Sequence, residues 1–596
     1  MTKFLSFFVF LFFSIAFAQD LIVTEKISNT TNNIDDGVIE LSVQNGTAPY
    51  SFKWSKQNVG LSSNKAEKLT EGEKYQVVIT DAKGVSVQKK YVVPTQNVSE
   101  KLNASMKPFV AAIGEVIFYD VFAAVGIYDP ILKDDAGNVL THPNGDPKKN
   151  AFPFIVIWLV LGAIFFTIYM GFINLTGVKH AFQLIRGDYD KPEDDGEVSH
   201  FQALVTALSG TVGLGNIAGV AVAVSLGGAG ATFWMIMAGF LGMSSKFVEC
   251  TLGVKYRVMN DNGEVSGGPM YYLAEALKRK GMATFGKVLA VIFAILCVGG
   301  SFGGGNMFQA NQSFAQLENV FPIFNGYGFY YGVVIALLVG VVIIGGIKKI
   351  ASVTDKIVPF MVVVYILAAL IIILANIQNI GAAFVQIFDG AFTADGVTGG
   401  VVGVLIVGFQ RAAFSNEAGV GSAAIAHSAV KTDEPVSEGI VALLEPFVDT
   451  IIVCTMTSLV LIFTGFAENT AGLDGAALTS AAFSSVFPWF RYVLLVAIIL
   501  FAFSTMISWS YYGMKAWTFL FGNNKRMENI YKILFLCFVV LGASVGLGAV
   551  IDFSDMMILG MALPNILGLY FLSKEVKLDL KSYFKRLKTG EIKKYN

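Results

Sequence analysis

The sequence predicts an all-α polytopic membrane protein that carries a small exported β-sandwich domain at its N-terminus. Hydrophobic residues make up 54% of the 596 residues and charged residues only 15%, with a mean hydropathy of +0.61. Long apolar runs recur after residue 152, whereas the stretch before residue 95 alternates apolar and polar residues. A lipid bilayer is the solvent that suits such a composition, and a net charge of −1 indicates no nucleic-acid partner.

Residues 1–18 have the pattern of a signal peptide. Lys3 precedes an apolar run from Phe4 to Phe17, and the small residues Ala16 and Ala18 flank its end. An uncleaved first helix is the alternative, but a run of about 14 residues is shorter than the ~20 that span a bilayer. We therefore expect an exported N-terminus.

Residues 19–95 are predicted to form the β-sandwich. Residues 38–43 and 75–80 alternate as strands do, and residues 45–46 and 81–84 are turn signals. The segments 36–37, 46–54 and 78–84 resemble the repeat module of bacterial surface and gliding-motility adhesins. Since the domain is expected to be exported, its function would be contact with envelope material or another protein.

Residues 96–151 are predicted to connect this domain to the membrane part. Residues 106–125 are apolar but interrupted by Lys107, Pro108, Glu115 and Asp120, and turn signals follow at 129–130 and 142–147. We interpret 106–125 as an interfacial helix on the exported face. A spanning helix is the competing interpretation, and it would reverse the orientation of everything that follows.

The segment 152–573 is predicted to be an eleven-helix transporter domain. Its apolar spans lie at 152–174, 201–226, 230–255, 284–313, 327–346, 356–376, 397–428, 441–466, 487–519, 530–550 and 556–573. The loops near 227–229, 314–326, 377–396, 467–486 and 551–555 contain no Lys or Arg. The alternate loops contain Lys179, Arg186, Lys278, Arg279, Lys280, Lys348, Lys349, Lys431, Lys525 and Arg526.

This charge asymmetry predicts the orientation. The positive-inside rule places the basic loops and the basic tail 574–596 in the cytoplasm, so the first span runs from outside to inside. That direction agrees with an exported N-terminal domain. We expect a multi-pass protein of the cytoplasmic (inner) membrane, with the β-sandwich in the periplasm or outside the cell.

Two glycine-rich segments predict a binding site. With the first span set aside, ten spans form two halves of five, and each half begins with an interrupted helix, at residues 209–216 and 411–422. Five spans reverse the direction of entry, so the halves are inverted copies, and paired breaks of this kind indicate a site at the membrane midplane. Close helix packing is the alternative role of the glycines. The polar residues Asn216, Ser415, Asn416 and Glu417 favour a site.

Several polar and aromatic residues are candidates for neighbours of this site. Gln309 is placed to bind polar groups of a substrate, and Trp509 lies one turn beyond Thr505, where it would limit the pocket to small side chains. A packing role is the alternative for Trp509. Arg411 and Glu417 flank the second break as gate charges or as a structural ion pair. The four cysteines lie in apolar spans and the four histidines lack metal-ligand spacing, so neither a disulfide framework nor a zinc site is expected.

The motifs of the membrane part resemble those of the alanine or glycine:cation symporter family. They are FQAL at 201–204, TVGLGNIAGV at 211–220, GPMYY at 268–272, FSNEAGVGS at 414–422 and FSTMISWSYYG at 503–513. The resemblance extends over about residues 152–572. The chain departs from the family at 227–230, where proline is common at the third place, and in its N-terminal β-domain.

Family membership implies the fold of the bacterial leucine transporter, a 5+5 inverted repeat, here with one extra N-terminal helix. It also implies that the amides of Leu214 and Gly215 hold the substrate carboxylate. The implied sodium site uses the carbonyls of Ser209 and Val212 with the hydroxyls of Ser504 and Thr505, hard oxygen ligands that suit a hard cation. Hydroxyls that bond back to their own helix are the alternative. The full set of predicted substrate-binding residues is Thr211, Leu214, Gly215, Asn216, Gln309, Ser415, Asn416 and Trp509.

The sequence therefore predicts a secondary active symporter, not an enzyme. Sodium and a small neutral amino acid, alanine or glycine, would bind at the midplane and cross by alternating access. No nucleotide-binding motif is present in the sequence, so the ion gradient would supply the energy. The alternative is a surface-sensing or adhesion protein in which the helices serve as a transporter-like membrane anchor.

Overall fold

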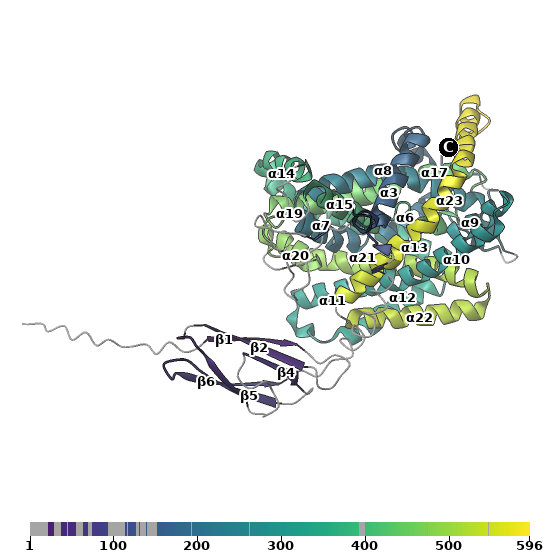
Figure 1. Ribbon diagram of the computed structural model, residues 1–596. Helices are drawn as coiled ribbons and strands as arrows, with labels where there is room; N and C mark the ends of the chain where they lie inside the picture. Colours follow the sequence, from purple (N-terminus) through teal and green to yellow (C-terminus); the bar gives the residue numbers. More distant parts are fainter. Residues whose placement is uncertain are drawn as a thin grey trace, which may run out of the picture. The chain divides into compact units, whose positions relative to one another are not determined.

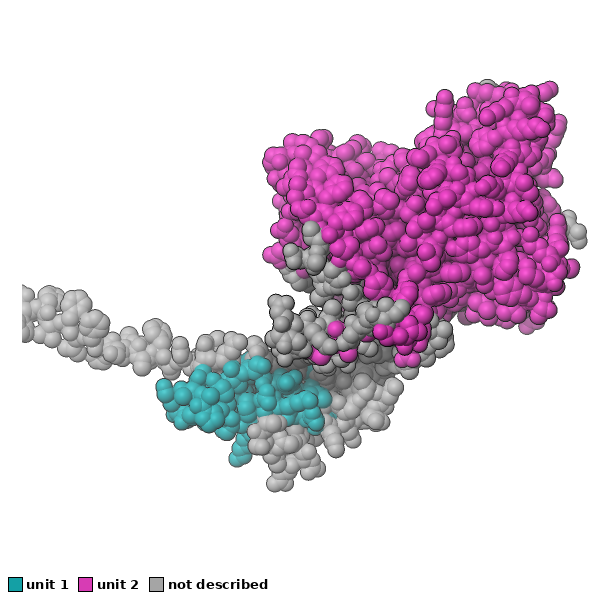
Figure 2. Space-filling model, turned by 45° about the horizontal axis from the view of Figure 1, so that its top comes forward, with its two compact units in different colours: residues 1–106 teal, residues 107–596 magenta. Residues whose placement is uncertain are grey.

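The computed structural model divides the chain into two units, residues 1–106 and residues 107–596 (Figure 2). It describes residues 22–28, 37–44, 46–54, 64–69, 74–92, 114–115, 117–126, 130–131, 139 and 152–595 without 192, 261–262, 393–399, 471–472, 474 and 546. The predicted signal peptide and most of the predicted connector lie outside the described residues.

The first unit contains two three-stranded antiparallel sheets. One has the order β1 (Ile22–Ser28), β2 (Gly37–Gln44), β4 (Lys65–Leu69), and the other β3 (Ser51–Trp54), β5 (Lys74–Thr80), β6 (Ser86–Val92). Alternate residues of both sheets meet in one core, which includes Ile39, Leu41, Trp54, Val77 and Ile79. This period of two, with apolar residues facing inward, makes the unit a sandwich, as predicted.

The second unit is helical. Its first half contains α3 (Phe154–Tyr169), α4 (Ile173–Thr176), α5 (Val178–Ile185), α6 (His200–Thr211), η1 (Leu214–Asn216), α7 (Ala218–Gly227), α8 (Gly230–Lys255), α9 (Pro269–Arg279), α10 (Ala283–Phe302), η2 (Gly303–Met307), α11 (Phe308–Val320), η3 (Pro322–Phe324), α12 (Gly328–Ile343), α13 (Gly346–Ala375), η4 (Ile377–Asn379) and α14 (Ile380–Phe392). A short hairpin, β7 (Val258–Met259) and β8 (Val265–Ser266), joins α8 to α9.

The second half begins at the second broken helix, and Figure 1 labels its longer helices. It contains α15 (Gly400–Asn416), α16 (Ala423–His427), α17 (Pro435–Ala442), α18 (Leu444–Pro446), η5 (Phe447–Cys454), α19 (Thr455–Phe463), α20 (Gly475–Val486), α21 (Phe490–Phe521), α22 (Lys525–Ser544) and α23 (Leu547–Thr589). Here η2 and η5 are π-helical, and both interrupt long helices. Such wide turns often occur where a helix approaches a functional site.

The packing of the helices follows the predicted repeat. Four helices of the first half pack against their counterparts five spans later: α7 against α15, α8 against α17, α10 against α21 and α12 against α22, whereas α13 packs against α6 and α21. Because an odd number of spans separates the partners, the partners cross the membrane in opposite directions. This packing agrees with the predicted 5+5 inverted repeat, which α3 precedes as an additional helix.

Each predicted span corresponds to an apolar helix or a run of consecutive helices, although several boundaries differ. In the part of the chain that the structure describes, seven helices are long and apolar enough to cross a membrane, and the bent pair 200–211 and 214–227 makes eight. The remaining three predicted spans correspond to the shorter apolar helices α3, α12 and α15. Sequence analysis missed α14 and α20, which lie in loops predicted to face outward. The predicted last span, 556–573, is also too short, because α23 continues through the basic segment to Thr589.

A fragment of the predicted connector docks on the helical unit. It includes the four-residue helical turn α2 (Val121–Ala124), which the Asp120 side chain caps. Asp120 also accepts a hydrogen bond of 2.7 Å from the amide of Phe152, at the start of α3. Ile117 is buried and faces Gly560 of α23. The described residues within 106–125 thus lie against the bundle.

Candidate functional site

The first broken helix changes direction at a glycine. The segments α6 and α7 meet at an angle of 56°, and α6 begins with a capping box formed by Ser199 and Gln202. At the break, a Cβ on Gly213 would lie only 2.5 Å from Oγ1 of Thr505 on α21. Any side chain there would collide with Thr505, so glycine permits the close approach of the break to α21.

Asn216 and Asp449 fasten the break from the other side. Asn216 accepts a hydrogen bond of 2.8 Å from the amide of Gly213 and donates one of 2.6 Å to Oδ1 of Asp449. Oδ2 of Asp449 accepts hydrogen bonds of 2.8 Å from the hydroxyls of Ser415 and Thr450. Since Asn216 belongs to the first break and Ser415 to the second, one buried carboxylate joins the two broken helices.

The amide of Leu214, expected to hold a substrate carboxylate, is in contact with Gln309. The side-chain oxygen of Gln309 accepts from it at 3.2 Å, while the Gln309 amide group donates to the carbonyl of Gly304 at 2.8 Å. An oxygen atom of the protein therefore occupies the position predicted for a substrate oxygen. Thr211, another predicted substrate contact, instead donates back to the carbonyls of Ala207 and Leu208 within α6.

The four predicted sodium ligands lie together where α6 meets α21. The hydroxyl of Ser209 donates to the carbonyl of Ser504 at 2.6 Å, and Val212 follows directly after the last residue of α6. The Ser504 hydroxyl donates to Phe501 of its own helix, the behaviour expected of the structural alternative. Oγ1 of Thr505 is different, because it is buried and has no hydrogen-bond partner among the described residues.

Trp509 lies between the two breaks. Its indole nitrogen is 3.2 Å from the carbonyl of Gly210 in α6 and 3.1 Å from Oε1 of Glu417 in the second break. The ring covers Gly305 of η2, where a Cβ would lie 2.2 Å from Cγ of the indole. The tryptophan is 1% exposed, so it closes the space between the breaks rather than facing lipid.

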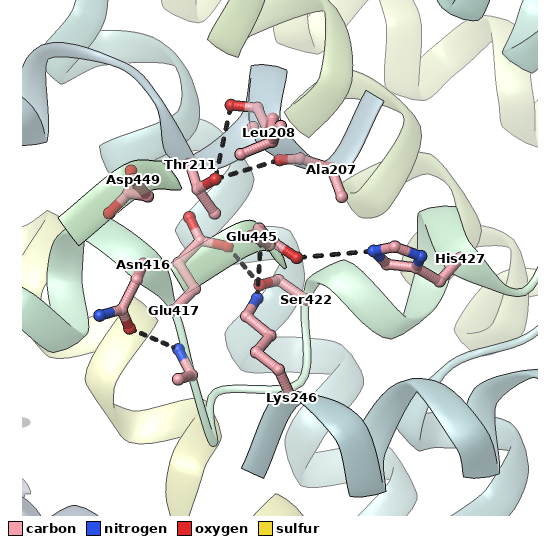
Figure 3. A network of polar contacts seen from close by, with 12 residues as sticks. Ala207, Leu208, Thr211, Lys246, Asn416, Glu417, Ser422, His427, Glu445 and Asp449 are labelled. Carbon is pink, nitrogen blue, oxygen red and sulfur yellow. Dashed lines mark hydrogen bonds and ion pairs between the residues drawn. The ribbon is translucent and has the colours of Figure 1, made fainter. Parts of the chain in front are cut away.

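The second break contains a carboxylate in an unusual backbone conformation. Glu417 has a φ of 54°, which side chains rarely adopt, and Ser422 donates a hydrogen bond to its Oε2. Asn416 accepts a hydrogen bond of 2.9 Å from the amide of Ala418, as Figure 3 shows, and donates one of 2.8 Å to Thr450. Arg411 and Glu417 do not pair with each other; Arg411 forms an ion pair with Asp555 of α23.

The predicted site residues are therefore brought together around the two breaks, and each of them is buried. Asp449 is the main residue that sequence analysis missed. An ionisable residue inside an apolar span is itself a signal, because a charge in a bilayer is costly and is kept for a purpose. Applied to the span 441–466, that rule would have identified Asp449.

Comparisons with known proteins cover the helical unit. The model of the sodium:alanine symporter family matches residues 144–596. The sodium/alanine symporter AgcS of Methanococcus maripaludis is 40% identical over 447 residues, which cover 74% of this chain and 96% of the relative. The probable sodium/glutamine symporter GlnT of Bacillus subtilis is 33% identical over 440 residues, which cover 73% of this chain and 89% of the relative.

Solved structures match the same part of the chain less closely. The crystal structure of MhsT in complex with L-phenylalanine has a TM-score of 0.44 and 15% sequence identity, over 65% of this chain and 98% of that chain. The family match begins at residue 144, so the β-sandwich lies outside it.

Proposed function

The chain belongs to the sodium:alanine symporter family, and on this premise we propose that it imports a small neutral amino acid, alanine or glycine, together with sodium. It is a multi-pass membrane transporter and not an enzyme. The match extends over residues 144–596, which include every helix from α3 to α23, and so favours transport over the adhesion alternative. Substrate and ion bind between the broken helices and cross as one bundle of helices moves against the rest.

The substrate carboxylate binds at the amides of Leu214 and Gly215, and in doing so it displaces the oxygen of Gln309. Three features support this assignment. An unwound helix exposes amides that favour a negative charge, Gln309 already presents an oxygen to Leu214 at 3.2 Å, and the surroundings are buried. Thr211, Asn216, Ser415 and Asn416 line the breaks as further substrate-binding residues, and Asn216 and Ser415 also hold the backbone in place through Asp449.

The unpartnered hydroxyl of Thr505 is the observation that carries the proposal. A buried hydroxyl without a partner costs free energy, about 1–3 kcal/mol, unless a ligand satisfies it. Its oxygen faces the break at Gly213, close to the carbonyl-rich end of α6, where Ser209 and Val212 lie. Sodium binding by Ser209, Val212, Ser504 and Thr505 would satisfy that oxygen.

Two sets of contacts close the site on opposite sides. Arg411 of α15 pairs with Asp555 of α23 on the side proposed to face outward. On the other side, Arg257 donates to the carbonyls of Ser428 and Val430 at 3.1 and 2.5 Å. Alternating access requires that these sets open in turn, and their separate locations allow it.

The proposed orientation follows from the basic loops. The chain lies in the cytoplasmic (inner) membrane with its C-terminus in the cytoplasm and the β-sandwich in the periplasm or outside the cell, after removal of a signal peptide at residues 1–18. The sandwich then folds separately from the transporter and contacts envelope material or another protein. Its own buried core and the two-unit division of the chain support this independence.

The direct test is uptake of labelled alanine by proteoliposomes that contain the purified full chain. We expect accumulation when an inward sodium gradient is imposed, and none when potassium replaces sodium. Glycine should compete and leucine should compete weakly. Uptake that is indifferent to sodium would refute the coupling, and no uptake of either amino acid would refute the substrate assignment.

A further inference from the structure

A buried group of charged side chains lies next to the proposed site but takes no part in it. The group consists of Lys246 and Glu249 of α8, His427 of α16, Glu438 of α17, Glu445 of α18 and His200 of α6. All six are at most 4% exposed. They come from five elements, and we refer to them as the inner cluster because the adjoining loops are those proposed to face the cytoplasm.

The members of the inner cluster form a continuous chain of contacts. His200 bonds to one oxygen of Glu438, and His427 Nδ1 lies 2.5 Å from the other oxygen. His427 Nε2 lies 3.5 Å from Glu445 Oε2, and the second oxygen of Glu445 accepts from Lys246 at 2.9 Å. Figure 3 shows the part of this chain from His427 through Glu445 to Lys246, beside Glu417 of the second break.

The charges of this group do not balance. Glu249, Glu438, Glu445 and the neighbouring Glu417 face a single lysine, which leaves a formal charge of −3 while both histidines are neutral. Protonation of both histidines reduces the charge to −1. Unbalanced charge is expensive in a buried site within a membrane. The closed protein therefore needs protons on this cluster.

The contact between His427 and Glu445 is long for a hydrogen bond, at 3.5 Å. His427 Nε2 and Glu445 Oε2 are both buried, and neither has an aligned hydrogen bond among the described residues. A proton on the histidine would give that pair an attractive interaction across 3.5 Å. In the described part of the chain, no group of three or more His, Cys, Asp or Glu side chains could hold a metal ion. A proton is thus the ligand that fits.

The cluster also has a route to water. His200 Nε2 lies 3.9 Å from Oδ1 of Asp190, whose side chain is 42% exposed. Asp190 lies in the loop that precedes α6, on the face proposed to be cytoplasmic. Other ionisable groups with an electrostatic effect on the cluster are His180, which interacts with His200, and Arg257, which interacts with Glu438. Asp449, Cys250, Tyr272 and Tyr512 lie around Glu445, Lys246 and Glu249. Of the cluster's contacts, those of His200 reach closest to the surface.

We propose that the inner cluster is a proton-binding site that exchanges with the cytoplasm through His200 and Asp190. Its protons sit on His200 and His427, which tie α6 and α16 to α17 through Glu438. Opening of the cytoplasmic side must separate these three elements, so bound protons hold that side closed. Loss of the protons to the cytoplasm leaves repelling carboxylates and favours opening.

The first test measures the charge of the histidines directly and does not depend on transport. The chain has four histidines, so ¹⁵N-histidine NMR spectra of the protein in nanodiscs can be assigned by substitution. We expect the signals that disappear in His200→Gln and His427→Gln to be those of imidazolium at about pH 7. Neutral rings at both positions would overturn the proposal.

The second test measures the effect on transport and rests on the proposed function. In right-side-out vesicles loaded at about pH 6 or about pH 8, the range in which histidine changes charge, we expect sodium-driven alanine uptake to be about tenfold faster at the higher internal pH. His200→Gln and His427→Gln should flatten this response. His142→Gln is the control, because this fourth histidine belongs to the predicted connector and not to the cluster.

A milder pair of variants guards against misfolding. Asp190→Asn, on the exposed side of the route, should weaken the response to internal pH, whereas Glu193→Gln in the same exposed loop should leave it intact. A response that is flat in the wild type, or that persists in both cluster-histidine variants, would overturn the proposal while sodium-driven uptake itself stands. Absence of uptake would instead refute the proposed function, and the NMR test would still decide on the proton site.

Discussion

The two broken helices occupy equivalent places in the inverted repeat, yet different chemistry holds them. Around the first break the contacts come mainly from the neutral residues Gln309, Asn216 and Thr505, and the carboxylate of Asp449 that binds Asn216 is shared with Ser415 of the second break. Around the second break they are charged, with Glu417 in the break, Arg411 before it and the inner cluster behind it. The two halves of the repeat therefore differ in the charge of the residues that surround their broken helices.

This difference suggests a division of labour. A binding site must attract a charged ligand and release it again, and neutral dipoles do so without a permanent countercharge that would retain it. Fixed charges in a membrane are better suited to holding elements together until a proton or a movement separates them. On this view the first break binds the ligands and the second controls access.

The largest effect is expected at Asp449, where the two breaks are joined. Asp449→Ala leaves the donors of Asn216, Ser415 and Thr450 without an acceptor, and breaking such a buried network costs about 3–5 kcal/mol. Uptake should fall at least about 100-fold. Asp449→Asn keeps one acceptor and should be less impaired. If Asp449→Ala protein, inserted in normal amounts, transports at the wild-type rate, the breaks are not coupled through this residue.

The next effect concerns the ion at the first break. The double variant Ser504→Ala/Thr505→Ala lacks two proposed sodium ligands. Each lost partner of a charge costs about 1–3 kcal/mol, so the sodium concentration that gives half-maximal uptake should rise by about tenfold or more. The sodium dependence of alanine uptake measures this change.

Ser510→Ala is the matched control for that pair. Its hydroxyl lies on the same helix but bonds only within it, to the carbonyl of Ile507 at 2.6 Å. We expect normal sodium dependence in this variant. An unchanged sodium dependence in the double variant would remove α21 from the ion site.

A smaller effect should follow from Trp509→Leu. The indole fills the space beside Gly305, so its removal leaves room for a larger substrate side chain. Valine or leucine should then inhibit alanine uptake at concentrations about tenfold lower than in the wild type. The reason is that a pocket discriminates by about 1–3 kcal/mol for each methylene group. Identical competition profiles before and after the change would place the indole outside the substrate pocket.

The smallest effect is expected from a change outside both breaks. Replacement of residues 19–95 by a short exported segment should leave alanine uptake within about twofold of the wild-type rate, because the sandwich has its own core and the site lies wholly in the other unit. Loss of uptake in correctly inserted protein would show that the β-domain takes part in transport.

The sequence predicted the features that follow from periodicity and composition. Apolar runs located the membrane helices, and the glycines of 209–216 and 411–422 located both breaks, because unwound backbone in a membrane needs those residues. The alternation in residues 38–43 and 75–80 located two strands of the sandwich. These are local signals that a single segment carries.

Other features depend on contacts between distant segments, which no local pattern reveals. Asp449 binds both Asn216 and Ser415, which are far apart in the sequence and are brought together only by the fold. The same holds for Arg411, whose partner Asp555 lies 144 residues further along the chain. Helix ends were misplaced where charged residues occur inside a helix, as with Lys348 and Lys349 near the start of α13.

The length of α23 has a practical consequence. Its 43 residues correspond to about 65 Å at ~1.5 Å per residue, roughly twice the hydrocarbon thickness of a bilayer. The last part is braced by ion pairs of Lys255 with Glu575 and Asp579, and of Arg586 with Glu434. A fiducial protein fused in helical register after Thr589 would therefore be held stiffly, which would make this small transporter tractable for single-particle imaging.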